Sequence, residues 1–263
     1  MALTVMASGA YLFSQKSEYV MVCVDRASVC TTRNVDNWKF KRLLWRSAIK
    51  YDKTEYKASI KLLNRALKYK PDSFVAYNNR GCAKFKLNNM TGALTDYNIA
   101  LSRAKNQREY SIALCNRGEA RAHLGEAEAA VTDCNTAIEL NPHNSHAYTY
   151  RGLAHFNLGS LDKAMQDFDT ALAMDNHDAE AYLYRARAKR VQKDMQGAMA
   201  DINKAVLLKP LEKQHYYERG FIKHQLNDES GARADFEKGL KLTLGPNAPT
   251  TKGMQIIKLK RME

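Results

Sequence analysis

The sequence predicts an all-α protein built as a solenoid of six helix-turn-helix repeats, and three observations support this prediction. An arginine followed by a small residue recurs at spacings of 34, 37, 34, 34 and 34 residues, at Arg46, Arg80, Arg117, Arg151, Arg185 and Arg219. Apolar residues within each unit fall at three-, four- and seven-residue steps, the periodicity of one helix face. Only five prolines and thirteen glycines interrupt the 263 residues, so long helices are allowed.

Each predicted unit carries large and small side chains at the same places. A large residue precedes the small one by four positions, at Leu43, Tyr77, Leu114, Tyr148, Tyr182 and Tyr216. A second small residue follows it by twelve positions, at Ser59, Ala93, Ala130, Ala164, Ala198 and Ala232. Another large residue comes four positions later, at Leu63, Tyr97, Cys134, Phe168, Ile202 and Phe236. Small residues let two helices cross closely, and large residues fill the space between neighbouring helices.

The two helices of a unit are expected to be separated by a turn near Asn88, Gly125, Gly159, Lys193 and Asn227. Pro71, Pro142 and Pro210 lie where one unit ends and the next begins, because proline cannot continue a helix. The predicted units are 40–73, 74–110, 111–144, 145–178, 179–212 and 213–246. The second is three residues longer than the others, around Ser102–Arg108.

The segments on either side of the repeats are less informative. Residues 1–39 form an N-terminal extension to which the sequence assigns no fold. Residues 247–263 are expected to form a capping helix that starts near Thr250 or Thr251 and buries Ile256, Ile257 and Leu259. The apolar start of the chain carries no basic residue before Lys16, which disfavours a signal or transit peptide. No apolar run is long enough to span a bilayer.

These large and small marks on a helix-turn-helix unit of 34 residues resemble the tetratricopeptide repeat, over residues 40–246. The resemblance implies a right-handed superhelical solenoid that acts as a non-catalytic protein-protein interaction scaffold or adaptor in a multi-protein assembly. It also implies that the first helices line a concave groove for a peptide or helix. The candidate groove residues are Tyr51, Asn78, Phe85, Lys86, His123, Leu153, Phe156, Arg187, Arg190, Tyr217, Phe221 and His224. Among them, Arg187 and Arg190 are placed to receive a carboxylate of the partner.

The recurring arginines have two interpretations. They could form a basic ladder for a polyanion, or each could pair with an aspartate of a second helix. Five units carry an aspartate sixteen residues after the arginine, at Asp96, Asp133, Asp167, Asp201 and Asp235. This matched recurrence favours structural pairs, since the planar guanidinium suits bidentate contact with a carboxylate. Arg46 has Leu62 at that place and is left for other work.

The positive charge of the chain is concentrated near its first repeat. The net charge is +13 and the pI about 9.4. Residues 36–70 hold eleven Lys/Arg and three Asp/Glu, a balance of 11 − 3 = +8. The candidate basic surface comprises Lys41, Arg42, Arg46, Lys50, Lys53, Lys57 and Lys61. One alternative function is therefore docking on a polyanionic microtubule, ciliary or RNA-containing assembly, although few groove positions are basic, which disfavours nucleic acid.

A co-chaperone adaptor is a third hypothesis. Family members of that kind clamp a C-terminal carboxylate with Lys, Asn and Arg side chains, but only Asn79 matches such a position here. The sequence shows no nucleophile elbow, phosphate loop or HExxH motif, so no enzyme and no cofactor are expected. His143 and His146 lack nearby cysteines or carboxylates, so no metal is expected. Five cysteines without CxxC spacing favour an intracellular, cytoplasmic protein, with cytoskeletal or ciliary association left open.

Overall fold

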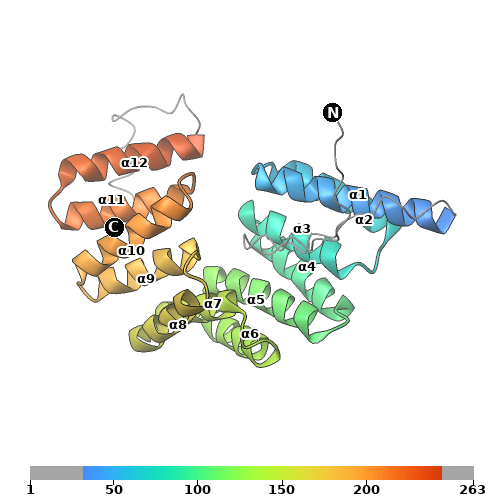
Figure 1. Ribbon diagram of the computed structural model, residues 1–263, viewed down its shortest axis with the longest axis horizontal. Coiled ribbons are helices and arrows are strands. Elements are labelled where there is room, and N and C mark those ends of the chain that lie inside the picture. Colours follow the sequence, from blue (N-terminus) through green and yellow to red (C-terminus); the bar gives the residue numbers. More distant parts are fainter. Residues whose placement is uncertain (1–31, 245–263) are drawn as a thin grey trace, which may run out of the picture. The chain divides into compact units, whose positions relative to one another are not determined.

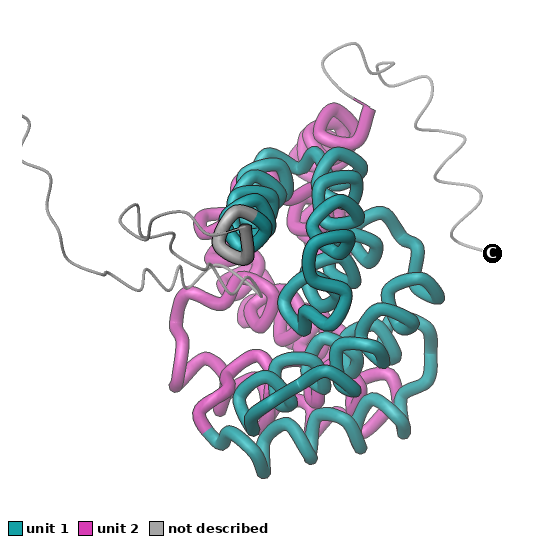
Figure 2. The backbone as a smooth tube through the Cα atoms, turned by 90° about the vertical axis from the view of Figure 1, so that its right-hand side faces the viewer, with its two compact units in different colours: residues 1–142 teal, residues 143–263 magenta. Residues whose placement is uncertain are grey.

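The structure, a computed structural model, describes residues 32–244, which fold into twelve α-helices with no strand in that range (Figure 1). The chain divides into two compact units, residues 1–142 and 143–263 (Figure 2). The first unit contains α1 Thr32–Asp52, α2 Tyr56–Tyr69, α3 Phe74–Lys86, α4 Met90–Arg103, α5 Gln107–Leu124 and α6 Ala127–Leu140. The second contains α7 Ser145–Asn157, α8 Leu161–Met174, α9 Ala179–Val191, α10 Met195–Leu208, α11 Lys213–Gln225 and α12 Glu229–Leu244. The predicted all-α fold is confirmed.

Helices pack in consecutive pairs, and each pair is one repeat. The first helix of every repeat contacts the second helix of the same repeat, as α1 contacts α2 and α11 contacts α12. First helices also contact one another within a unit: α3 touches α5, and α9 touches both α7 and α11. We call the helices α7, α9 and α11 the first-helix layer of the second unit.

Glycine allows the two helices of a repeat to approach closely. A Cβ atom added at Gly152 would lie 2.6 Å from the ring of Phe168, and one at Gly220 would lie 2.7 Å from Phe236. Real Cβ atoms do not come so close to another carbon, so even alanine forces a shift here. The predicted role of the small and large residues at the helix crossing is thus confirmed in these repeats.

The turns inside the repeats use left-handed backbone conformations. Asn88, Lys193 and Asn227 have φ of 61°, 66° and 62°, and the turn glycines Gly125 and Gly159 have 85° and 72°. Asparagine and glycine adopt this region with the least strain. The five predicted turns are therefore confirmed, and a sixth, at Thr54 with φ of 59°, carries no such signal in the sequence.

Two elements differ from the expected boundaries. Helix α1 begins at Thr32, eight residues before the predicted start of the first repeat at residue 40. The three extra residues of the second repeat are accommodated beside α5, which has 18 residues where α3 and α7 have 13. The side chain of Asn106 caps this longer helix by accepting a hydrogen bond from the Glu109 amide at 2.9 Å. The predicted capping helix 247–263 and residues 1–31 lie outside the described residues.

Within residues 32–244, no helix combines the length and the apolar character needed to cross a membrane.

Candidate protein-binding site

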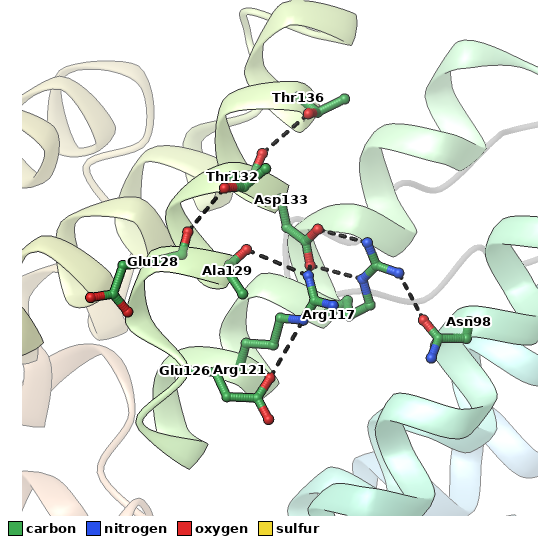
Figure 3. A network of polar contacts seen from close by, with 9 residues as sticks. All are labelled: Asn98, Arg117, Arg121, Glu126, Glu128, Ala129, Thr132, Asp133 and Thr136. Carbon is green, nitrogen blue, oxygen red and sulfur yellow. Dashed lines mark hydrogen bonds and ion pairs between the residues drawn. The ribbon is translucent and has the colours of Figure 1, made fainter.

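The recurring arginines form ion pairs inside the repeats, as Figure 3 shows for the third repeat. The Nε and Nη2 atoms of Arg117 donate hydrogen bonds to the two carboxylate oxygens of Asp133 at 2.8 and 2.7 Å. Nη1 of Arg117 donates to Asn98 of the preceding repeat at 2.7 Å. Arg121, one turn further along α5, donates to the same Asp133 at 2.7 Å. We call this arrangement of an arginine and the aspartate sixteen residues later a rung.

Rungs recur in the four other repeats where the sequence predicts them. The shortest nitrogen to oxygen distance is 2.6 Å in each of Arg80–Asp96, Arg151–Asp167, Arg185–Asp201 and Arg219–Asp235. A second basic residue reaches the same aspartate in three of them, through Lys84, Lys189 and Lys223. The five aspartates are buried. The hypothesis of structural pairs is confirmed, and these arginines do not form a free basic ladder.

The rungs hold both partners in their charged forms. The hydrogen bonds that Arg80 donates to Asp96 raise the pKa of the Arg80 guanidinium above its ordinary value, against the opposing effect of burial. Burial alone would raise the pKa of the Asp235 carboxyl, but hydrogen bonds from Arg219 and Lys223 outweigh it and lower that pKa. A carboxylate held this way stabilises the fold at neutral pH.

The fourth repeat has the weakest rung. His155 stands where the other rungs have lysine or arginine, and its Nε2 lies 3.9 Å from Asp167. Burial lowers the pKa of His155, so its ring is neutral at pH 7. Asp167 therefore relies on Arg151 for its positive partner.

A different cluster of charges lies on the first-helix layer of the second unit. Nε of Arg187 donates to one carboxylate oxygen of Glu218 at 3.1 Å, and Nε of Arg190 donates to the other at 2.7 Å. Both arginines come from α9, and Glu218 comes from α11. Glu218 is buried, whereas the arginine side chains are 28% and 27% exposed. Two guanidiniums thus converge on one carboxylate at the surface of this layer.

The other predicted groove residues of the sixth repeat differ in their exposure and in their contacts. Phe221 is 42% exposed and meets Phe236 edge-on at 5.2 Å between ring centroids. His224 contacts Glu229 through Nδ1 at 2.6 Å. The hydroxyl of Tyr217 lies 3.2 Å from that of Thr243 on α12. Phe221 is therefore the apolar side chain that this helix presents most openly.

Polar residues continue along the same layer behind the arginines. The Tyr150 hydroxyl donates to Glu180 at 2.9 Å, and Lys209 reaches the other oxygen of Glu180 at 3.4 Å. His215 is fully buried, and burial lowers its pKa to about 4, with the nearby charge of Lys209 acting in the same direction. The two contacts of Glu180 connect α9 with α7 and with the end of α10.

Four predicted groove residues are packed inside the repeats instead of facing a partner: Tyr51, Asn78, Phe85 and Leu153 are buried. Asn78 accepts a hydrogen bond from Asn116 at 2.9 Å. These four side chains therefore contribute to the packing between helices.

The remaining candidates outside the sixth repeat reach the surface to different extents. Lys86 and His123 are exposed, and Phe156 is half-buried. The His123 ring meets that of Phe85 edge-on, with centroids 5.3 Å apart.

Most residues of the predicted basic surface are exposed to solvent. Arg42, Arg46, Lys53, Lys57 and Lys61 are exposed.

Lys41 and Lys50 are half-buried, and Lys50 pairs with Glu55 at 2.6 Å. The side chain of Arg46 makes no ion pair or hydrogen bond to any residue in the described range. This confirms that the first repeat lacks the rung.

Sequence reasoning missed two features of these surfaces. Glu218 occupies a position that is asparagine or tyrosine in the second to fifth repeats, and this change was the available signal. Trp38 and Trp45 are 49% and 50% exposed on α1. They are the only tryptophans of the chain, and both lie in its most basic segment.

The comparisons with known proteins agree with the repeat architecture. The tetratricopeptide repeat profile matches residues 49–108, 79–145, 115–179 and 151–212, together more than half of the chain. A thermophilic tetratricopeptide repeat protein of Thermus thermophilus superposes with a TM-score of 0.60 and 22% identity, over 76% of this chain and 98% of that one. A tetratricopeptide repeat protein of Parabacteroides merdae gives 0.52 and 24%, over 84% of each chain.

A third structure, the Cut9-Hcn1 hetero-tetramer of the APC/C, has a TM-score of 0.67 at 13% identity, over 86% of this chain and 46% of that one. At these identities the likeness concerns the solenoid fold alone. Among proteins with curated descriptions, none matches the chain. The repeat profile, the twelve paired helices and these neighbours together show that the chain belongs to the tetratricopeptide repeat family, whose members generally act as non-catalytic interaction modules.

Proposed function

We propose that this protein is a non-catalytic scaffold that binds an acidic segment of a partner protein on the first-helix layer of its fifth and sixth repeats. The observation that carries the proposal is the convergence of Arg187 and Arg190 on the single carboxylate of Glu218. The cluster holds two positive charges and one negative charge, so it retains an attraction for one more carboxylate.

The geometry leaves hydrogen-bond donors for that second carboxylate. Glu218 is contacted through the Nε atom of each arginine. Each guanidinium also has two terminal Nη groups, and a carboxylate accepts a pair of such N–H donors side by side. Because Glu218 already holds both side chains in place, an arriving acid loses little free energy to ordering them.

An apolar contact is available beside this charged site. Phe221 lies three residues after Glu218 on α11, on the same side of the helix. Exposed aromatic and arginine side chains are the usual energetic anchors of protein interfaces. The favoured ligand is therefore an extended or helical segment with a carboxylate next to an apolar residue.

A conservative pair of substitutions tests the proposal. Arg187→Lys with Arg190→Lys keeps a cation beside Glu218 but removes the Nη forks. A charge reversal would instead leave Glu218 buried and unpaired and would destabilise the fold. The matched control is Arg103→Lys with Arg233→Lys, which changes two exposed arginines elsewhere.

The partner is first captured by crosslinking in native extract, identified, and then titrated as a purified protein. We expect the lysine pair to weaken binding about tenfold, or ~1.4 kcal/mol, and the control pair to leave it unchanged. The unfolding midpoint of both variants should stay within about 3 °C of wild type, which corresponds to ~1 kcal/mol. Equal affinity of the lysine pair and wild type would refute the site.

Docking of the basic surface on a polyanion is a second candidate, because Arg42, Arg46, Lys53, Lys57 and Lys61 are exposed together in the first repeat. Salt separates the two: binding to nucleic acid falls steeply, with a log-log slope of about −0.9 per phosphate contacted. Contact with the arginine pair should fall far less. A co-chaperone role would instead show as loss of binding when the last residues of the partner are removed.

The cysteines bear on the compartment. Cys82, Cys115 and Cys134 are buried and form no disulfide within the described residues. This supports a reducing compartment such as the cytoplasm, which we propose as the site of action.

A further inference from the structure

Helix α1 presents an open face that the corresponding helices of the other repeats do not have. Trp38, Arg42, Trp45, Arg46 and Ile49 recur at helical spacing along one side of α1. We call these five residues the α1 end face. Both tryptophans are half-exposed, at 49% and 50%, and both arginines are exposed. Nonpolar rings of this size are seldom left so open without a partner.

The equivalent positions of the other repeats are buried. The positions equivalent to Trp45 are Asn79, Asn116, Tyr150, Tyr184 and Glu218, and all are at most 5% exposed. The positions equivalent to Ile49 are also fully buried, at Ala83, Ala120, Ala154, Ala188 and Ile222. The same face of a first helix is thus covered in five repeats and open in the first.

The cover in the internal repeats is a helix. Ala76, the equivalent of Arg42, belongs to one apolar cluster with Leu63, Ala66 and Leu67 of α2. Ala181, a further equivalent, packs in the same way with Ala171 and Leu172 of the preceding α8. A helix laid across this face is therefore the arrangement that the fold already uses.

Charge indicates the chemistry of a helix that would cover the α1 end face. In four rungs the Nη1 atom of the arginine donates to an oxygen of the preceding second helix, supplied by Asn64, Asn98, Asp169 and Asn203. Arg46 occupies the same position and has no such oxygen among the described residues. Between Asp36 and Asp52, helix α1 carries five basic and no acidic residues. An amide or carboxylate oxygen at this place would complete the pattern, and the excess positive charge of α1 favours a carboxylate.

The occupant is not shaped like another repeat of this chain. Arg42 stands where four other repeats have alanine, and its long side chain stacks on Trp38 at 5.1 Å from the ring centroid. Such a side chain blocks the close helix approach that alanine permits, which argues against a second copy stacked in the repeat register. It instead adds a positive charge and a broad apolar surface.

We infer that the α1 end face binds an acidic amphipathic helix of a partner protein, whose apolar side covers Trp38, Trp45 and Ile49 and whose carboxylates meet Arg42 and Arg46. This surface does not depend on the proposed function of the arginine pair in the second unit. The scaffold would thus hold one partner by its first repeat and another by its fifth and sixth.

Intrinsic fluorescence reports this surface directly, because Trp38 and Trp45 are the only tryptophans in the chain. The full-length protein is titrated with a synthetic leucine- and glutamate-rich amphipathic helix of about 18 residues. Its twin has glutamine in place of every glutamate. We expect the glutamate helix to shift the emission to the blue and to protect it from acrylamide, and the twin to bind at least about tenfold more weakly, or ~1.4 kcal/mol.

Matched variants locate the binding on this face. Arg42→Gln with Arg46→Gln should abolish the preference for the glutamate helix. Lys57→Gln with Lys61→Gln removes the same charge from exposed positions of α2, also four residues apart, and should keep the preference. Arg187→Lys with Arg190→Lys should leave the fluorescence titration unchanged, so a failure here is distinct from a failure of the proposed function.

Other outcomes overturn the inference. Equal binding of the two peptides, or an equal loss in the Lys57 and Lys61 variant, would mean no acidic site on this face. A blue shift with phosphatidylserine vesicles but not with the glutamate helix would identify a membrane surface instead. If deleting residues 1–31 made the tryptophans of the free protein more accessible to acrylamide, the occupant would be the protein's own N-terminal segment.

Discussion

The first repeat and the five that follow place the same arginine in opposite situations. From the second repeat onward the arginine lies between two helices and donates to a buried aspartate at 2.6 to 2.7 Å. In the first repeat Arg46 is exposed, and Leu62 stands where the later repeats have the aspartate. The recurring arginine therefore stabilises the fold only in those repeats that also contain the aspartate with which it pairs.

The largest difference in stability is expected when the recurring arginine is removed from a later repeat and, separately, from the first. Arg151→Ala leaves the buried carboxylate of Asp167 with only the neutral ring of His155, at 3.9 Å. An uncompensated buried charge costs about 3 kcal/mol. Arg46→Ala removes an exposed side chain and should cost less than about 0.5 kcal/mol. Denaturant unfolding of the two variants measures the difference, and similar losses would contradict the distinction.

The helix crossing offers a second contrast. The first repeat has Ser47 where most of the others have glycine, and its crossing partner is Leu63 rather than an aromatic ring. Gly152→Ser would drive a side chain into Phe168, and overpacking of this kind costs about 2 kcal/mol.

Ser47→Gly removes only a small side chain and should cost about 1 kcal/mol through backbone entropy. Thermal unfolding distinguishes the two variants. An unchanged unfolding midpoint in Gly152→Ser would show that the helix crossing accommodates a larger side chain without overpacking.

The sixth repeat has His215 at the position equivalent to Arg42. The Arg42 side chain is exposed, whereas His215 is buried. The pKa of His215 is lowered to about 4 from an ordinary 6.5. The unfolded chain therefore binds a proton that the folded chain refuses between these values, and stability falls as the pH drops through this window. The loss from pH 7.5 to pH 5 should be about 2 kcal/mol.

Unfolding free energies measured across this pH range should show that slope, with a smaller contribution of the same sign from His155. His215→Gln should flatten it. An unchanged slope in that variant would assign the pH dependence to other groups.

The smallest effect is expected at the second basic position of the rungs. His155→Lys would give the fourth repeat the second cation that Lys84, Lys189 and Lys223 supply elsewhere. A partly exposed ion pair of this kind contributes about 0.5 kcal/mol, so the variant should be slightly more stable than wild type. A lower midpoint in thermal unfolding would indicate that the ring of His155 packs better than a lysine stem.

The sequence predicted the repeats well, because their period, their small residues at the helix crossings and their matched arginines and aspartates are local and recur. It predicted the candidate site less well. Asn78 and Leu153 lie on first helices yet are buried, and Asn78 is contacted by Asn116 of the next repeat. Burial of this kind depends on packing that the sequence of one repeat does not reveal. The sequence placed Arg187 and Arg190 together on one helix, but it did not predict their internal partner Glu218, which comes from the next repeat, 31 and 28 residues away.

Double-mutant cycles test the central contrast most directly. One cycle combines Arg151→Ala with Asp167→Ala, and the other combines Arg46→Ala with Leu62→Ala, each measured by guanidinium chloride unfolding. We predict a coupling free energy of about 2 kcal/mol in the first cycle and less than about 0.3 kcal/mol in the second. Comparable couplings in the two cycles would contradict the claim that this arginine is a structural element in the later repeats and a free one in the first.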